Sequence, residues 1–236
     1  MRNFFIATIL FFFTLPIYAQ DAKAICIKID ELNTAILNGS IKKQDAATQF
    51  KGLIAQLAAA MPVDHNATWL FPLQGYNYKA IGGTKGNGYS DKGYHFLDGN
   101  KHLAHPAHDI FIKDKNQDGL DDHTNQAVNV LAINNGIVLS CTNEWDNTSS
   151  LRGGRYIWVY HRSLGIITYY AHNREIFVKP GDVVKQGQKI AEVGRTGYNA
   201  YKKRSPTHLH FSAYNLVDGL PVPFNPYQQL TKAITQ

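Results

Sequence analysis

The strongest chemical signal in this chain is a pair of histidines, His208 and His210, separated only by Leu209. The run from Thr207 to Phe211 reads as a β-strand, and side chains two positions apart on a strand point to the same face of the sheet. Both imidazoles are therefore expected to project into one site. Imidazole and carboxylate groups suit Zn²⁺, and three such ligands leave a fourth position open for water, which is typical of catalytic zinc sites.

A histidine and a carboxylate that would complete such a set lie upstream, at His105 and Asp109 in a polar segment. A further histidine, His172, ends an apolar run that reads as a strand. Spacing alone leaves other pairings open, because His102 and His108 bracket His105. A single histidine on a strand is also more often a surface or hydrogen-bonded core residue than a ligand. The residue types therefore indicate a zinc hydrolase without selecting every ligand.

Six short β-like runs are predicted to position these residues, and turn signals such as Asn-Gly, Pro-Gly and Gln-Gly separate several of them. The runs are 129–133, 136–140, 156–160, 166–170, 189–193 and 208–212. No amphipathic helix intervenes between them, which favours an antiparallel sheet over a parallel one. From Trp69 onward the chain is thus predicted to be mainly β.

The segment before the β-like runs, residues 22–61, has helical periodicity instead. One apolar stripe is formed by Ile25, Ile29, Leu32 and Ile36. An Asn-Gly pair at 38–39 is predicted to end this helix, and a second helix should end before residue 62. We therefore expect an export signal over 1–19, a helical hairpin over 20–66 and a β domain over 67–236. The hairpin is expected to pack on the β domain; a position over a substrate groove, which would keep an enzyme latent, is a second hypothesis.

The first 19 residues are typical of an export signal, with Arg2 ahead of an apolar run and Ala19 at the expected cleavage point. The run is shorter than the roughly 20 apolar residues that a membrane span needs. The mature chain is therefore expected to be exported, either periplasmic or secreted, without a membrane span. The net charge of the full sequence is +6, and removal of Arg2 with the signal leaves +5 (6 − 1). This surplus favours a polyanionic partner, and without a basic stripe we expect the cell wall rather than nucleic acid. Cys26 and Cys141 either form a disulfide or remain free thiols.

A second candidate metal site is an acidic run over residues 114–122, which matches the start of a calcium-binding loop. The oxygen ligands would come from Asp114, Asn116, Asp118, Leu120 and Asp122. However, Asn125 stands where an EF-hand has its bidentate glutamate, and no flanking helices are predicted. A calcium site and an ordinary Asp/Asn-rich turn are thus both open.

Five elements occur in a fixed order along residues 69–214: His105-xxx-Asp109, Tyr170-x-His172, Val178–Ile190, Gly194-Arg-Thr-Gly197 and His208-x-His210. This ordered set resembles the lysostaphin/LytM-like zinc metallopeptidases. The resemblance implies an antiparallel, sandwich-like β domain in which His105, Asp109 and His210 bind Zn²⁺. It also implies that His172 and His208 act beside the metal without binding it.

The function expected from this resemblance is that of an exported zinc endopeptidase that hydrolyses peptide bonds of cell-wall peptidoglycan. Zn²⁺ is the expected cofactor, with Ca²⁺ as a possible second ion at the acidic run. A first rival is a catalytically inactive regulator of wall amidases, since relatives that have lost zinc ligands act in that way. A second rival is a secreted metallopeptidase that acts on other peptides.

Overall fold

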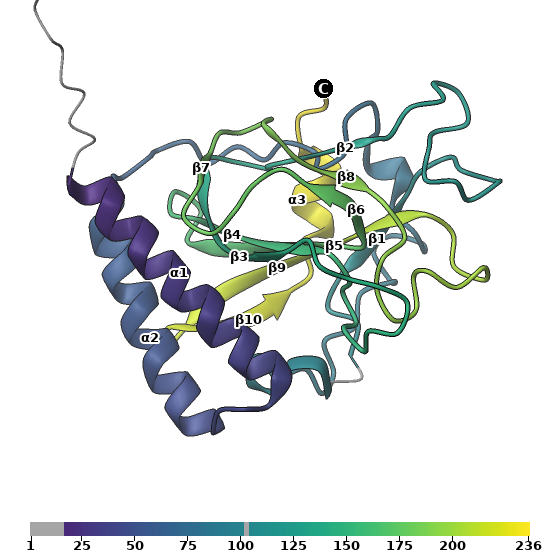
Figure 1. Cartoon of the computed structure of the whole chain (residues 1–236). Helices are drawn as coiled ribbons and strands as arrows, with labels where there is room; N and C mark the ends of the chain where they lie inside the picture. The colour runs from purple at the N-terminus through teal and green to yellow at the C-terminus, as the bar shows by residue number, and fades with distance from the viewer. Residues whose placement is uncertain (1–16, 102–103) are drawn as a thin grey trace, which may run out of the picture.

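The computed structural model describes residues 17–101 and 104–236 of the 236-residue chain. Most of the predicted export signal, and His102 among the candidate histidines, lie outside the described residues. Within the described part, two helices cover one side of a set of antiparallel strands, and a smaller group of strands lies on the other side (Figure 1). No helix among these residues is both long enough and apolar enough to cross a bilayer.

The larger sheet has seven strands, all paired in antiparallel fashion. Its order is β1 (His108–Phe111), β9 (His208–Val217), β5 (Ile166–Ala171), β4 (Tyr156–His161), β3 (Gly136–Thr142) and β7 (Val183–Val184), and β10 (Leu220–Phe224) pairs with β9. β9 lies between β1 and β5 and is the longest strand. Residues from two distant parts of the chain, β1 and β9, are thereby held side by side.

A second, three-stranded sheet has the order β2 (Asn129–Leu131), β8 (Lys189–Val193) and β6 (Asn173–Ile176). Its apolar residues, such as Val130 and Ile190, share one buried cluster with Val138, Val159 and Tyr170 of the larger sheet. The two sheets therefore bury one face of each against the other, as in a sandwich. The predicted mainly β, sandwich-like fold is confirmed.

The predicted hairpin is present as α1 (Ile17–Asn38) and α2 (Lys43–Ala60). Gly39 follows α1 with a φ of 68°, a left-handed conformation that ends many helices and suits glycine. The apolar stripe of α1 is buried against the opposite face of the large sheet, where Ile29, Leu32 and Ile36 join Ile137 and Ile167 in a second cluster. The helices pack on the sheet as expected, whereas the boundaries between the three predicted parts stay a prediction.

The 3₁₀ turn η2 (Phe96–Lys101), which we call the strap, packs against the hairpin and the large sheet. The Phe96 ring packs edge-on against Phe50 of α2 and Trp158 of β4, with ring centroids 4.9 and 5.8 Å apart. A Cβ on Gly99 would lie 2.5 Å from the Ile36 carbonyl oxygen, so only glycine allows this close approach to α1. The hairpin thus holds the chain just before the residues that lead to His105.

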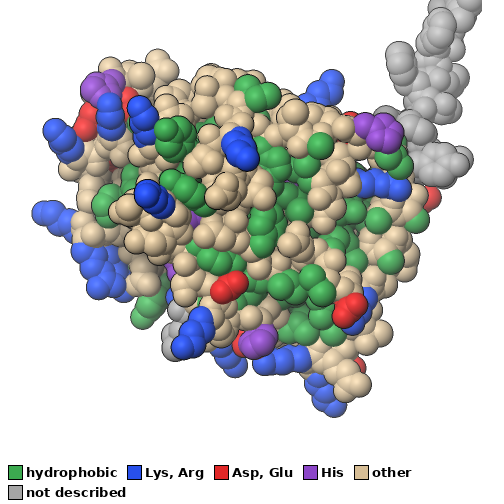
Figure 2. Space-filling model, turned by 180° about the vertical axis from the view of Figure 1, so that it is seen from behind, with side chains coloured by type: hydrophobic (Ala, Val, Ile, Leu, Met, Phe, Trp, Pro, Cys, Tyr) green, Lys and Arg blue, Asp and Glu red, His purple; other side chains and the backbone are tan. Residues whose placement is uncertain are grey.

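The six predicted strands all appear, and the structure adds four that the sequence did not indicate: β1, β6, β7 and β10. Two other short elements, η1 (Tyr78–Ala80) and α3 (Tyr227–Lys232), complete the fold. On the face seen in Figure 2, hydrophobic side chains gather over the middle, and Lys and Arg are scattered around them. The chain has 24 Lys and Arg against 18 Asp and Glu, which gives the net charge of +6.

Candidate metal centre and active site

The register of two paired strands creates the centre of the site. In the β1–β9 ladder Asp109 lies opposite His210, and Phe111 lies opposite His208. Because alternate residues on a strand share a face, Asp109, His208 and His210 all project from the same face of the sheet. This is also the face that α1 covers farther along.

Three potential ligand atoms meet at this point. His105 Nε2 lies 3.1 Å from Asp109 Oδ1, and His210 Nδ1 lies 3.2 Å from the same oxygen. Within the described part of the chain, His105, Asp109 and His210 are the one group of His, Cys, Asp or Glu residues whose ligand atoms lie mutually within 4.8 Å. The grouping is therefore the same as the zinc set that the sequence predicts.

His105 is oriented by the backbone around it. Its amide and carbonyl pair with Ser90, and its ring Nδ1 lies 3.0 Å from the Gly88 carbonyl oxygen. A carbonyl oxygen only accepts hydrogen bonds, so Nδ1 carries the hydrogen and donates it. In the neutral ring, Nε2 is left with its lone pair toward Asp109. A histidine whose far nitrogen is held in this way is typical of metal sites.

The charge states of Asp109 and His210 suit a cation. Burial raises the pKa of Asp109, but its contacts with the His105 and His210 rings outweigh this effect and hold the pKa far below the usual carboxyl range. Burial lowers the pKa of His210 to about 4, against the opposing effect of Asp109. At neutral pH the site thus contains an ionised carboxylate and an unprotonated His210 imidazole, the forms in which both groups bind metal.

Two further histidines, His172 and His208, flank this group. Their rings are 4.9 Å apart, and the His172 ring is 5.3 Å from that of His210. His172 Nδ1 donates to the Thr196 carbonyl at 2.8 Å, and His208 Nδ1 donates to the Pro206 carbonyl at 2.7 Å. Both rings therefore keep Nε2 available for other partners; that of His208 lies 3.6 Å from Asp109 Oδ1.

The neighbourhood of His172 leaves little freedom to its ring. His172 has a φ of 67°, and its amide donates to the Gly153 carbonyl. A Cβ on Gly197 would lie 2.8 Å from His172 Nδ1. Burial, followed by the charges of His208 and His210, lowers the pKa of His172 well below its usual value. This imidazole is thus fixed in place and neutral at pH 7.

These side chains line a cleft of about 290 Å³. The lining also contains residues that sequence reasoning did not select: Ala104, Arg152, Gly153, Tyr169, Asn199, Ala200 and Ser205. Arg152 and Gly153 stand in a glycine-rich turn, Arg-Gly-Gly-Arg, and that motif is the one signal that might have drawn attention to them. No residue of α1 or α2 lines this cleft, so the latency hypothesis for the hairpin gains no support from it.

The other histidines that the structure describes lie outside this group of ligand atoms. His108 projects from the opposite face of β1, where its Nε2 lies 2.8 Å from Asn225 Oδ1 and its ring packs against Tyr89 and Tyr227. The alternative pairing through His108 therefore has no geometric basis. His161 is fully buried, with Nδ1 donating to the Asn135 carbonyl and Nε2 2.8 Å from Thr168 Oγ1. Its ring is used entirely within the fold.

Comparison with known families bears directly on this arrangement. Residues 115–224 match the sequence profile described as Peptidase family M23. This part of the chain is thus similar to M23 peptidases. The matched stretch holds His172, His208 and His210, whereas His105 and Asp109 lie just before it. The family match therefore does not include His105 and Asp109, and their proximity to His210 is known from the structure alone.

Among curated proteins, the chain is 42% identical over 69 residues to the peptidoglycan DD-endopeptidase ShyB of Vibrio cholerae, which covers 29% of this chain and 14% of that protein. It is 38% identical over 85 residues to a lipoprotein NlpD/LppB homolog of Pseudomonas aeruginosa. This match covers 36% of the present chain and 25% of that protein. The chain thus spans a quarter or less of the curated relatives it matches. Among solved structures, the catalytic domain of lysostaphin from Staphylococcus simulans is 26% identical, with 56% and 80% coverage and a TM-score of 0.39.

The acidic run over residues 114–122 does not form a comparable group of ligands. Asp114 accepts hydrogen bonds from the amides of Asp118 and Gly119 and from Thr207 Oγ1. Asp122 accepts from the Lys115 amide. Asn116 and Asp118 bond to each other, and Asp118 also accepts from the Leu120 amide. The oxygens predicted to bind Ca²⁺ are thus largely engaged with the protein, and the calcium prediction gains no support.

Both cysteines of the chain are free thiols rather than a disulfide. Cys26 is buried in α1, and Cys141 of β3 donates to the Val178 carbonyl. Burial raises the pKa of each thiol to about 12. Both therefore stay protonated and unreactive at neutral pH.

Proposed function

We propose that this chain is a zinc-dependent peptidase that hydrolyses peptide bonds in cell-wall peptidoglycan. The observation that carries the proposal is the convergence of His105, Asp109 and His210 within 4.8 Å, next to two histidines whose Nδ1 atoms are already committed. One carboxylate oxygen and two imidazole nitrogens form a donor set that suits Zn²⁺ and leaves a position open. The residues present thus fit the metal.

Zn²⁺ held by these three residues would supply Lewis-acid polarisation of a peptide carbonyl and acidification of a water. The protein's own share begins with His172. Its Nδ1 is bonded to the Thr196 carbonyl, and its neutral Nε2 is the atom that can accept a proton.

His208 lies beside His172 in the cleft, with the two ring centroids 4.9 Å apart, its Nε2 near Asp109 and its Nδ1 donating to the Pro206 carbonyl. In this position His208 can orient a substrate oxygen, or return a proton to the departing amine. Because both rings are anchored through backbone carbonyls, neither needs to reorganise during the reaction, and preorganised groups of this kind account for much of enzymatic rate enhancement.

Peptidoglycan as the substrate is supported by three observations. The chain is similar to a peptidoglycan DD-endopeptidase, it carries a net charge of +6 that suits a polyanionic wall, and its first 19 residues are typical of an export signal. Export to the periplasm or the exterior is part of the same proposal, because the polymer lies there.

An inactive regulator of wall amidases is the alternative, and similarity to an NlpD/LppB homolog is the observation that favours it. The two functions differ in their need for a complete ligand set. The presence of His105, Asp109, His172, His208 and His210 around one cleft argues for the peptidase.

The test is digestion of purified sacculi by the zinc-loaded protein, with released muropeptides identified by mass. We expect zinc at one equivalent per chain and release of peptide fragments, both lost in His105→Ala. The exposed His65, which lies outside the cleft, provides the control variant His65→Ala. Absence of bound zinc together with absence of released fragments would favour the regulator. Cleavage of ordinary proteins but not of sacculi would instead favour a peptidase with other substrates.

A further inference from the structure

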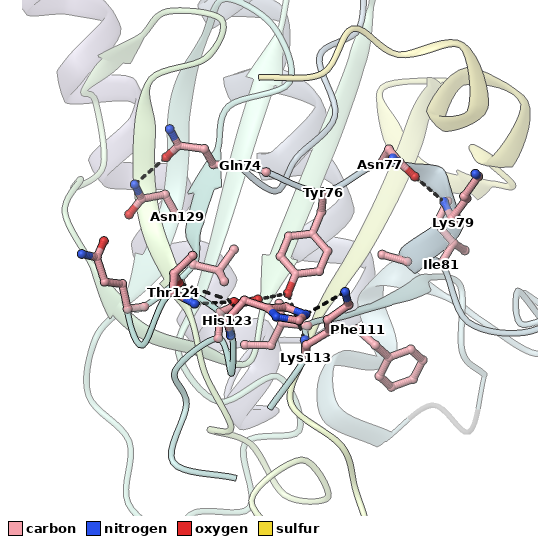
Figure 3. Close-up of a pocket in the computed structure, with 17 residues that line it drawn as sticks. Gln74, Tyr76, Asn77, Lys79, Ile81, Phe111, Lys113, His123, Thr124 and Asn129 are labelled. Atoms are coloured by element: carbon pink, nitrogen blue, oxygen red, sulfur yellow. Dashed lines mark hydrogen bonds between the residues drawn. The ribbon is translucent and has the colours of Figure 1, made fainter. Parts of the chain in front are cut away.

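A second, larger concavity lies on the outer side of β1, away from the predicted zinc ligands. It has a volume of about 880 Å³, within the range of small-molecule sites in proteins. Three stretches of chain form its walls: residues 74–81, residues 111–113 and residues 121–129. We call it the β1 groove. Its lining is drawn in Figure 3.

The β1 groove adjoins the cleft through a single side chain. Phe111 lines the groove, and its ring centroid lies 5.4 Å from that of His208 in the cleft. Gly82 makes room for this ring, because a Cβ at Gly82 would lie 2.4 Å from Phe111 Cε2. Phe111 is thus the shared wall between the two cavities. A polymer lying along the edge of β1 can occupy both at once.

The polar groups of the β1 groove are mainly uncharged. Asn129 Nδ2 donates to Gln74 Oε1 at 2.7 Å on one side, and Asn77 caps the turn that carries Lys79 on the other side (Figure 3). The Tyr76 ring hangs between them, and its phenol accepts from the Lys113 amide. Amide side chains, a phenol and apolar side chains such as Ile81 together form a surface of mixed polarity.

The charge that this surface presents is positive. Its one carboxylate, Asp121, accepts hydrogen bonds from the Tyr76 hydroxyl and from the amides of His123 and Thr124. Burial raises the pKa of Tyr76 to about 12, with Asp121 acting in the same direction, so the phenol stays protonated and remains the donor. Asp121 is therefore satisfied within the protein. Lys79 and Lys113 are both exposed at the rim, where they can meet an anionic ligand.

We propose that the β1 groove binds the glycan strand of the wall polymer, a chain of acetamido sugars whose carboxyl groups are amide-linked to the stem peptides and are free carboxylates on the sugars that carry no peptide. Amide side chains pair with acetamido and hydroxyl groups, Phe111 and Ile81 offer apolar contact to sugar faces, and the two lysines suit the carboxylates. The proposal rests on the proposed function, since the glycan strand would lie beside a peptide held in the cleft. It assigns the groove the role of selecting glycan-linked peptides.

Direct binding provides the first test. The probe is a peptide-free oligomer of alternating N-acetylglucosamine and N-acetylmuramic acid, titrated into the zinc-loaded full chain. The double variant Gln74→Ala/Asn129→Ala removes the amide pair at the surface, and we expect about tenfold weaker binding from the loss of its hydrogen bonds. Gln56→Ala, at an exposed position of α2 outside the groove, is the matched control and should bind as the parent protein does.

A lysine of the groove provides a second test. Lys79→Gln should weaken binding of the carboxylated oligomer by about threefold to tenfold and reduce its dependence on salt. Lys28→Gln, at an exposed position of α1, keeps the same change of net charge outside the groove and should have no such effect. Equal weakening by both lysine variants would mean that only the overall charge matters, and the proposed site would be wrong.

Kinetics separates this proposal from the proposed function. On sacculi we expect the Gln74→Ala/Asn129→Ala variant to lose about tenfold in kcat/KM, with unchanged kcat/KM on cross-linked peptides that carry no sugar. Equal losses on both substrates, or weaker binding of the sugar-free peptides, would overturn the glycan assignment in favour of a peptide site. If the parent protein cleaves neither substrate, the proposed function fails, and the oligomer titration alone decides whether the groove binds glycan.

Discussion

Two regions of this molecule contain residues that the sequence predicts to be metal ligands. The regions differ in whether the lone pairs of these residues point at one another or at hydrogen-bond donors of the protein. In the cleft, His105 and His210 direct ring nitrogens at Asp109, and backbone carbonyls such as that of Gly88 take up an outward-facing nitrogen. In the acidic run, Asp114 directs both oxygens at amides of its own loop and at Thr207. Ligand types are present in both regions, yet only in the cleft do they converge.

An arginine side chain, that of Arg195, lies beside the acidic run. Arg195 donates to Thr207 Oγ1 at 3.1 Å and to the Ser205 carbonyl at 2.7 Å. Burial lowers the pKa of Arg195, and the charge of Asp114 opposes this effect. Since Thr207 immediately precedes His208, this network secures the beginning of β9. The acidic run thus supports the strand that carries His208 and His210.

The largest expected effect comes from removing a predicted ligand. His210→Ala should lose bound zinc and lower hydrolysis by at least about 10³-fold, because one imidazole of the donor set is gone. Zinc analysis and sacculus digestion on the same preparation measure both. Stoichiometric zinc in a folded His210→Ala protein would contradict the ligand assignment.

His208→Ala should fail in a different way. The variant should retain zinc and lose about 10²- to 10³-fold in kcat, since a group that acts on the substrate is removed without touching the metal set. Comparison of zinc content and kcat with His210→Ala separates the two roles. If both variants lose zinc alike, His208 is a ligand and the division between the two histidines is wrong.

The buried His161, which lies outside the cleft, is expected to make the stability of the protein depend on pH. Burial lowers the pKa of His161 to about 4, below the 6.5 of an exposed histidine. Between these values the unfolded chain binds the proton and the folded chain does not, so stability is complete above pH 6.5 and declines toward pH 4. The difference corresponds to about 3 kcal/mol. His161→Gln should flatten this dependence in urea unfolding at pH 4–7; an unchanged slope would show that other groups cause it.

The smallest effect is expected at the acidic run. Asp114→Ala removes an acceptor of three hydrogen bonds and should lower the free energy of unfolding by about 2 kcal/mol, with zinc content unchanged. Added Ca²⁺ should leave the melting temperature of the parent protein unchanged, as in Asp114→Ala. A rise in melting temperature with Ca²⁺ in the parent but not in the variant would restore the calcium site.

The strands that the sequence predicts are those with long apolar runs, such as β4 and β5, since burial on both faces leaves a clear pattern. β1 has only four residues, and two of them, His108 and Asp109, are polar, so its pairing with β9 could not be read. β10 contains Pro221 and Pro223, which argue against a strand except at an edge, where it lies.

In the site, the residue types indicated a zinc centre, and the resemblance to the lysostaphin/LytM-like metallopeptidases implied His105, Asp109 and His210 as its ligands. The groups that orient the rings are backbone carbonyls of Gly88, Thr196 and Pro206. Every residue has such a carbonyl, so no sequence pattern distinguishes these three. The β1 groove was beyond prediction for a related reason, since its lining comes from three separate stretches that only the fold brings together.

The hairpin and the predicted zinc ligands share one face of the large sheet, and this gives the cleft a blind end. Beyond His210 the space narrows to a cavity of about 70 Å³, which is walled by Asn33 and Ile36 of α1 and by Gly99 of the strap. Such a volume holds about two water molecules and no amino-acid residue. A peptide chain lying in the cleft therefore cannot continue between the sheet and the hairpin at this point.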